Sequence, residues 1–183
     1  MENVIALYAL SDRPEHRERS LVEQARDGSR VAFGELYQQH VRMVHGLLLA
    51  RVPHSEVDDM VQDVFLLAFR RLSSLKDGAA FPGWLATIAR NLSVDYHRRT
   101  PKTAEIDESM LRQMPPPPEA LGVLEMIRNL PDAYRETLVL RLVEGLTGPE
   151  IATQTGLTPD SVRVNLHRGM KMLREKLEGR AAL

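Results

Sequence analysis

The stretch PEIATQTGLTPDSVRVNLHR, residues 149–168, contains two short helix-forming segments on either side of Gly156. A glycine at this position allows a tight turn, because it can adopt a positive φ without steric cost. Thr158 has the side chain of a helix N-cap, and Pro159 suits the first position of the helix that follows. Ala152 is small enough to let the two helices cross closely. This order of residues predicts a helix-turn-helix.

The second helix of this motif has two different faces on a helical wheel of about 100° per residue. From 161 to 174 there are four Lys or Arg residues and no acidic residue. Such a face can enter a major groove, where Arg and Asn contact base edges and Lys contacts phosphate. Charge alone would favour the alternative, a solvated basic face on an ordinary helix pair, and the turn and caps in register favour DNA binding. The expected packing face is Val162, Leu166, Met170 and Leu173, and the candidate DNA-binding residues are Ser161, Arg163, Val164, Asn165, His167, Arg168 and Lys171.

Composition limits the classes of protein that the chain can belong to. With 183 residues, 43% of them hydrophobic and 27% charged, it fits one large folded domain or two small ones. The net charge is −1, so binding to nucleic acid must depend on local charge. The absence of cysteine excludes disulfides and thiolate zinc sites and suits a reducing compartment.

The N-terminal residues 1–19 are expected to form a tail, either frayed or folded as a short docking helix. Their apolar segment, residues 3–10, is too short to span a bilayer and follows acidic Glu2 instead of a basic region. We therefore expect no membrane insertion and a cytoplasmic location.

Long stretches with helical apolar periodicity and almost no strand-like alternation predict an all-α fold. Four consecutive prolines at 115–118 interrupt this pattern, since they cannot continue a helix. We interpret 101–119 as a flexible, Pro-rich linker between two small helical domains, 20–100 and 120–178. A surface loop within one domain is the alternative, but loops of that length are uncommon in compact domains. Helices are expected at 20–27, 30–51, 54–74, 82–99, 119–129, 131–144, 148–154 and 159–177.

The helix expected at 54–74 combines a continuous apolar stripe with an acidic and polar face. Leu66 is an aliphatic residue in the middle of that face. A lone exposed leucine usually has no significance, but one surrounded by carboxylates and an amide resembles an interface anchor with a polar rim. The face by itself is equally compatible with a protein partner and with an exposed leucine of no significance. The stripe is Val57, Met60, Val61, Val64, Phe65, Ala68 and Leu72, and the opposite face carries Asp59, Gln62, Asp63, Leu66 and Arg70.

The segment FPGWLATIARNLSVDYHRRT, residues 81–100, combines an indole, hydrogen-bonding groups and arginines on one helix face. Such groups suit a single nucleic-acid strand, whose bases can stack and whose phosphates need neutralising. A core position for Trp84, and an ion pair of Asp95 with a neighbouring arginine, are the alternatives. The expected inward residues are Leu85, Ile88, Ala89, Leu92 and Tyr96, and the candidate nucleic-acid-binding residues are Trp84, Thr87, Asn91, Asp95, Arg98 and Arg99.

These blocks, taken in order, resemble bacterial RNA polymerase sigma factors of the extracytoplasmic-function (ECF) group, two-domain members of the sigma-70 superfamily. The resemblance spans about 20–178, with 20–100 corresponding to region 2 and 120–178 to region 4. The blocks that carry it are ARDGSRVAFGELYQQH (25–40), EVDDMVQDVFLLAFRRL (56–72), FPGWLATIARNLSVDYHRR (81–99) and LPDAYRETLVLRLVEGLTGPEIATQTGLTPDSVRVNLHRGMKMLREKL (130–177).

The resemblance implies a transcription initiation factor without a cofactor, a metal or chemistry of its own. The loop between Ser73 and Pro82, with the helix that follows, would open the −10 promoter element and hold its non-template strand, with one base flipped into a pocket at the loop. The helix at 159–177 would read the −35 element as a duplex. Implied partners are promoter DNA, the β′ clamp helices and β flap of core polymerase, and an anti-sigma factor. Core binding is implied for Asp58, Asp59, Gln62, Asp63 and Leu66.

Two other classes of protein compete with this interpretation. A helix-turn-helix regulator that acts without polymerase would leave the acidic face and the segment 81–99 unexplained. A metal-dependent hydrolase could use Asp58, Asp59, Asp63 and His97, since Asp59 and Asp63 are one helical turn apart. However, the six histidines are scattered and form no His-x-x-x-His spacing, so we do not expect an enzyme.

Overall fold

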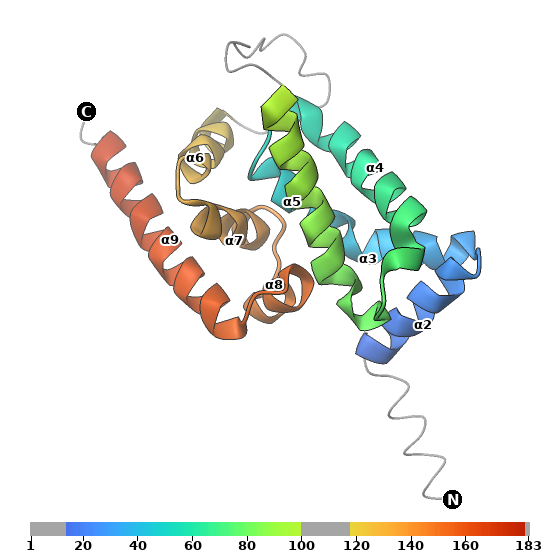
Figure 1. Cartoon of the computed structure of the whole chain (residues 1–183). Coiled ribbons are helices and arrows are strands. Elements are labelled where there is room, and N and C mark those ends of the chain that lie inside the picture. Colours follow the sequence, from blue (N-terminus) through green and yellow to red (C-terminus); the bar gives the residue numbers. More distant parts are fainter. Residues whose placement is uncertain (1–13, 100–117, 182–183) are drawn as a thin grey trace, which may run out of the picture.

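The computed structural model describes residues 14–99 and 118–181, and every regular element in these two ranges is a helix. The all-α prediction is therefore confirmed. The predicted linker, up to residue 117, and residues 1–13 of the predicted tail lie outside the described residues. The first domain contains α2 (Pro14–Arg26), α3 (Arg30–Leu49), α4 (His54–Arg71), the 3-10 turns η1 (Leu72–Ser74) and η2 (Gly78–Ala80), and α5 (Phe81–Arg99) (Figure 1).

The second domain contains four helices joined by short loops. They are α6 (Pro118–Arg128), α7 (Asp132–Leu142), α8 (Gly148–Thr155) and α9 (Pro159–Ala181). Gly156 has φ +74°, as the predicted turn requires. Thr158 accepts a hydrogen bond from the backbone N–H of Ser161 at 3.1 Å and so caps α9. The predicted helix-turn-helix is therefore formed by α8 and α9.

Local capping explains where several helices begin. The Ser29 hydroxyl accepts a hydrogen bond from the Ala32 N–H at 3.2 Å at the start of α3. At the start of α8, Thr147 and Glu150 form a reciprocal capping box. The first helix begins at Pro14, earlier than the expected residue 20. Proline is favoured in the first turn of a helix, so this residue permits the earlier start.

Helix α3 is the centre of the first domain and packs against α2, α4 and α5. Its residues Met43, Val44, Leu47 and Leu48 are completely buried. The apolar stripe predicted for α4 is buried along its whole length. The sequence periodicity therefore identified the buried side of α4 correctly.

In the second domain α9 packs against α7, with Val162 and Leu173 buried as expected. The prediction that Met170 packs inward is wrong, since this side chain is 38% exposed. Gly169 lies close against α7, where an added Cβ would lie 3.0 Å from Cδ1 of Leu138. A small residue at the helix crossing brings the two backbones together, which turns Met170 toward solvent.

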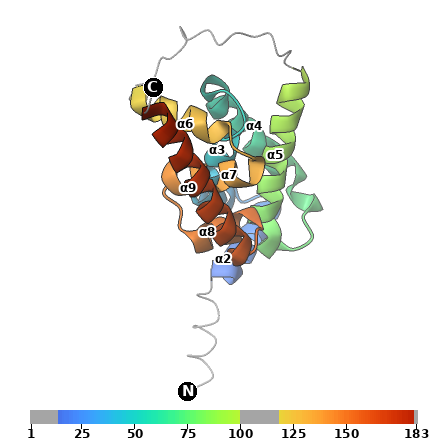
Figure 2. The same cartoon turned by 90° about the vertical axis from the view of Figure 1, so that its left-hand side faces the viewer.

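The two domains pack against each other, with α7 and α8 lying against α3 and α5 (Figures 1 and 2). The approach is close at Gly46, where an added Cβ would lie 2.7 Å from Leu140 Cδ2 and 2.8 Å from Glu144 Cγ. Gly83 of α5 likewise faces Gly156 at the turn of the helix-turn-helix. Small residues on both sides therefore permit this contact.

We predict that Gly156→Ala lowers the free energy of unfolding by about 1–2 kcal/mol, because alanine is strained at positive φ. Chemical denaturation followed by circular dichroism measures this change. Gly34→Ala is the matched control: Gly34 is exposed in α3, its φ is not positive, and an added Cβ meets nothing within 4 Å. The control should gain about 0.5–1 kcal/mol. A Gly156→Ala protein as stable as the unsubstituted chain would contradict the prediction.

Candidate nucleic-acid and protein interface

The polar face of α9 is open to solvent. All of the candidate DNA-binding residues on it are exposed except Asn165, which is half-buried. Arg163 forms an ion pair with Asp160 at 3.2 Å, and both side chains are largely exposed. Pairs of this kind contribute only about 0–1 kcal/mol, so the arginine can exchange its partner at little cost. The exposed residues are Ser161, Arg163, Val164, His167, Arg168 and Lys171.

A groove of about 500 Å³ lies between α4 and α5 and includes most of the candidate single-strand-binding residues. Asn91, Asp95, Arg98 and Arg99 line it, together with Arg71 from the end of α4. Asp95 forms an ion pair with Arg98 at 3.7 Å, as in the alternative considered for this residue. Arg71 was not identified from the sequence, because nothing in the pattern of α4 shows that its last turn faces α5. The groove thus presents three arginines beside polar groups.

Trp84 and Thr87 lie nearer the start of α5, outside this groove. Trp84 is half-buried and packs against the core, with its ring centroid 6.0 Å from that of Phe81. Thr87 is exposed, and its hydroxyl donates to the Gly83 carbonyl at 2.9 Å. The core alternative for Trp84 is therefore partly met, since the indole is half-buried and packs against Phe81.

The acidic face of α4 is exposed throughout. Asp58, Asp59 and Gln62 border a hollow of about 650 Å³, whose other side includes His45 and Glu144. Leu66 is 48% exposed, and Phe69, one turn further along, is 44% exposed. Asp63 lies on the same solvent-facing side. The expected interface anchor is thus a pair of apolar side chains, of which the sequence analysis identified only the first.

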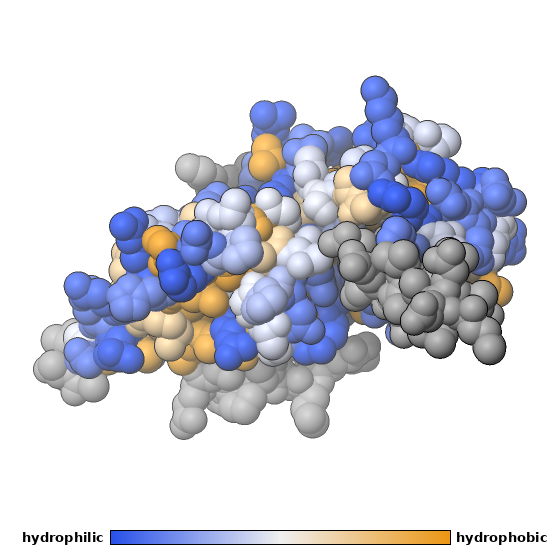
Figure 3. All heavy atoms as spheres, turned by 90° about the horizontal axis from the view of Figure 1, so that it is seen from below, coloured by the Kyte–Doolittle hydropathy of each residue, from blue (hydrophilic) through white to orange (hydrophobic). Residues whose placement is uncertain are grey.

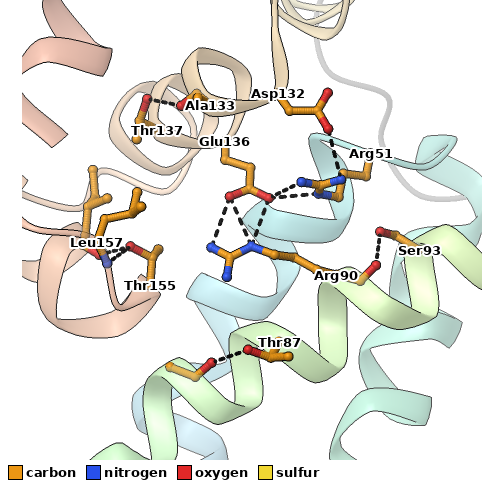
Figure 4. Close-up of polar contacts among 12 residues, drawn as sticks. Arg51, Thr87, Arg90, Ser93, Asp132, Ala133, Glu136, Thr137, Thr155 and Leu157 are labelled. Atoms are coloured by element: carbon orange, nitrogen blue, oxygen red, sulfur yellow. Dashed lines mark hydrogen bonds and ion pairs between the residues drawn. The ribbon is translucent and has the colours of Figure 1, made fainter. Parts of the chain in front are cut away.

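The contact between the domains depends on a buried carboxylate. Glu136 of α7 is 5% exposed and receives hydrogen bonds from two arginines of the first domain (Figure 4). Arg51, in the turn that follows α3, donates from Nε at 2.8 Å, and Arg90 of α5 donates from Nη2 at 3.1 Å. Arg128 of α6 also donates to the carbonyls of Leu49 and Val52, at 3.1 and 2.9 Å. No sequence pattern indicated these contacts, which join residues 46 to 85 positions apart.

A second carboxylate at this contact faces a histidine. His45 Nδ1 lies 2.7 Å from Glu144 Oε1, and Arg42 Nε lies 4.0 Å from Glu144 Oε2. The pKa of His45 is raised above its ordinary value, chiefly by the hydrogen bond with Glu144. Burial opposes this shift, and the charges of Glu144 and Asp58 add to it. A protonated His45 therefore favours contact between the domains.

The residues considered for a hydrolase do not form a site. His97 Nε2 contacts the Arg51 carbonyl at 2.8 Å, whereas Asp58 and Asp59 border the hollow beside His45. Among the described residues, no group of three His, Cys, Asp or Glu side chains could hold a metal ion. The structure thus gives no geometric support to the metal-dependent alternative.

Seen from the end where α2 and α8 lie, the surface is mainly hydrophilic, and its apolar area lies on the side of α9 (Figure 3). Met170 and Leu177 are exposed apolar residues of that helix. None of the described helices has the length and hydropathy needed to cross a membrane.

Comparison with known proteins identifies both domains. The family Sigma-70 region 2 matches residues 36–103, and the family Sigma-70, region 4 matches residues 120–173. The RNA polymerase sigma factor CarQ of Myxococcus xanthus is 32% identical over 171 residues, which cover 85% of this chain and 95% of CarQ. The ECF RNA polymerase sigma-E factor of Haemophilus influenzae is 29% identical over 180 residues, which cover 88% of this chain and 95% of the relative.

A solved structure supports the same assignment. CnrH, determined in complex with the cytosolic domain of CnrY, has a TM-score of 0.64 to this chain and 27% sequence identity. The similarity covers 89% of this chain and 98% of CnrH. The arrangement of helices therefore agrees with the sequence matches.

We predict that the packing of the two domains weakens as pH rises. The contribution of His45 is complete below its unperturbed pKa of about 6.5 and is lost as pH rises through its raised pKa in the packed state. The chain has no cysteine, so single cysteines introduced at the exposed Gln62 and Glu178 can carry a fluorophore pair that reports the separation. The separation should increase with pH across this window. In His45→Gln the pH response should be smaller, and identical profiles for the two proteins would refute the assignment.

Proposed function

The chain belongs to the ECF RNA polymerase sigma factors, and we propose that it binds core polymerase, reads a −35 element as duplex DNA and opens the −10 element. The observation that carries this proposal is the exposure of three different faces, on α4, α5 and α9, although the two domains pack together. Each face has the chemistry that one of these three contacts needs. Sigma factors initiate transcription and are not enzymes, and this function implies a location in the bacterial cytoplasm, where the polymerase works.

The α4 face is the proposed contact with the polymerase β′ clamp helices. Leu66 and Phe69 would be its apolar anchors. The carboxylates of Asp58, Asp59 and Asp63 would form the polar rim and steer the encounter with a basic partner. Because α4 is rigid and its opposite side is buried in the core, this face needs no rearrangement to bind.

The groove between α4 and α5 is the proposed site of the opened −10 strand. Unpairing a base costs a few kcal/mol, which stacking and polar contacts to the unstacked base can offset. Arg71, Arg98 and Arg99 would neutralise the phosphates, while Asn91 and Asp95 would form hydrogen bonds to bases. An aspartate favours base contacts over phosphate contacts, so the groove suits specific recognition of the strand.

The exposed face of α9 is the proposed reader of the −35 element. Val162 and Leu173 anchor the helix in its domain, so the opposite face is presented as a rigid unit to a major groove. Each domain alone would bind promoter DNA weakly. Both would bind well when polymerase holds them together, because tethering raises the effective concentration of the second contact. We expect the β flap to hold the second domain in that complex.

We also infer that an anti-sigma factor controls this protein. The supporting observation is that CnrH, the similar chain described above, is solved in complex with the cytosolic domain of another protein, CnrY. The exposed pair Leu66 and Phe69 would serve such an inhibitor as well as it serves polymerase. Competition between the two for α4 would be sufficient for control.

We predict that Leu66→Arg abolishes binding to core polymerase while the fold is kept, because the side chain points to solvent and a charge would be buried at the interface. Co-migration with core polymerase in size-exclusion chromatography measures binding, and circular dichroism verifies the fold. Leu177→Arg, at a 40% exposed leucine of α9, is the matched control and should bind normally. Normal binding by a folded Leu66→Arg protein would show that α4 is the wrong surface.

We predict that Arg168→Ala reduces promoter-dependent transcription with little change in affinity for core polymerase. An arginine contact with a base is worth about 1–3 kcal/mol, which corresponds to a loss of roughly 5- to 150-fold. Run-off transcription and a parallel core-binding assay separate the two quantities. Arg174→Ala is the control, since Arg174 is exposed on the same helix but lies about 120° around the helix from Arg168. Equal losses in both assays would contradict a role confined to DNA.

A DNA-binding test also distinguishes the proposed sigma factor from a helix-turn-helix regulator that acts without polymerase. In a gel shift with promoter duplex, this chain should retain DNA only when core polymerase is present. Tight retention by the chain alone would favour the regulator.

A further inference from the structure

In the loop between α4 and α5, every third residue from 72 to 78 is buried. Leu72, Leu75 and Gly78 are buried, whereas the residues between them are exposed. The backbone forms the two 3-10 turns η1 and η2, and the Ser74 hydroxyl donates to the Arg71 carbonyl at 2.6 Å. The loop is therefore an ordered surface with exposed polar side chains. These are Ser73, Ser74, Lys76 and Asp77.

Helix α2 packs against the buried side of this loop. An added Cβ at Gly78 would lie 3.0 Å from Cα and 3.3 Å from the carbonyl oxygen of Arg19, so the two backbones touch. Arg26 Nε donates to the Leu72 carbonyl at 3.3 Å. Arg19 Nη2 donates to Asp77 Oδ1 at 3.2 Å. The match to Sigma-70 region 2 begins at residue 36, so this support comes from a helix outside the matched segment.

The Asp77 carboxylate is oriented by these contacts. Its Oδ1 accepts hydrogen bonds from the backbone N–H of Ala79, at 3.1 Å, and from Arg19. The first of these bonds is the main cause, and Arg19 a further cause, of a pKa for Asp77 below its ordinary value. The carboxylate is thus ionised at neutral pH. Because both bonds engage Oδ1, Oδ2 remains available as an acceptor for a ligand.

The Arg19–Asp77 pair is too exposed to matter much for stability. The two side chains are 47% and 58% exposed, and exposed pairs contribute little to folding. The pair instead fixes an orientation: the hydrogen bond from Arg19 of α2 restrains the Asp77 side chain, which lies where the loop meets solvent. A restraint that adds little to stability but fixes an acceptor suggests a role in recognition.

We propose that Arg19 is a positioning residue for promoter recognition, which directs the Asp77 carboxylate toward one unstacked base of the −10 element. This inference rests on the proposed function, in which the loop lies beside the opened strand. A carboxylate oxygen accepts from an amino group on a base edge, as in the contact between aspartate and cytosine N4. Adenine and guanine also carry amino groups, whereas thymine places carbonyl oxygens on both sides of its N3–H and repels the carboxylate.

The experiment uses the full chain with core polymerase and a promoter library randomised through the −10 element. Initiation from each sequence is measured, together with affinity for core polymerase. Arg19→Ala should reduce the preference for amino-bearing bases at one −10 position, on the order of tenfold or less. Preferences at the other positions, those in the −35 element and core affinity should stay unchanged. Arg19→Lys, which keeps a donor, should restore part of the preference.

Two further variants make the result specific. Arg17→Ala is the matched control, since Arg17 lies on the same helix and pairs with Glu35 at 3.4 Å, not with the loop. It should keep the original profile. Asp77→Asn should change the same position as Arg19→Ala, and the double variant should lose no more than Asp77→Asn alone, because the arginine acts through the aspartate.

The possible results separate this inference from the proposed function. A profile for Arg19→Ala identical to that of the unsubstituted protein, or an equal loss at every position, would overturn the positioning role while the protein still selects promoters. Failure of the unsubstituted protein to direct core polymerase to any promoter would instead reject the proposed function.

Discussion

The hydrogen-bonded ion pairs of Glu136 with Arg51 and Arg90 are the interaction on which the arrangement of the molecule depends (Figure 4). The carboxylate comes from the second domain, and both guanidinium groups come from the first. Without it, two positive charges would face each other in an interface largely closed to water, which is strongly unfavourable. Gly46 permits the close approach that brings these groups together. The position of α9 relative to α4 and α5 follows from this contact.

The polar chemistry of this interface explains how the two domains can pack stably against each other and still separate. Glutamate and arginine regain hydration when the domains separate, whereas a purely apolar interface would expose a large apolar surface to water. The contact also occupies the sides of α3, α5, α7 and α8 that are not needed for the proposed binding. Packing therefore conceals none of the three candidate faces, and a change in domain separation would alter their spacing without altering the faces themselves.

Errors of the sequence-based predictions have local physical causes. Periodicity on α4 identified every buried residue of its stripe, because one side of that helix faces a continuous core. On α9 it failed at Met170, because a wheel ranks residues by hydropathy while the crossing with α7 selects the small Gly169. Phe69 belongs to neither predicted face of α4, so only the structure shows that it is exposed. The predicted role of each face nevertheless remains a proposal.

The amino-acid sequence by itself determined the helices, the capped turn around Gly156, the buried stripes and the family, because these depend on residues that are close along the chain. Only the tertiary structure decided which side chains meet. Glu136 reaches residues 46 and 85 positions away, His45 meets Glu144 across 99 positions, and Arg19 holds Asp77 across 58. Such pairs leave no local periodic signal, since each partner looks like an ordinary charged residue of its own helix or loop until the fold brings the two together.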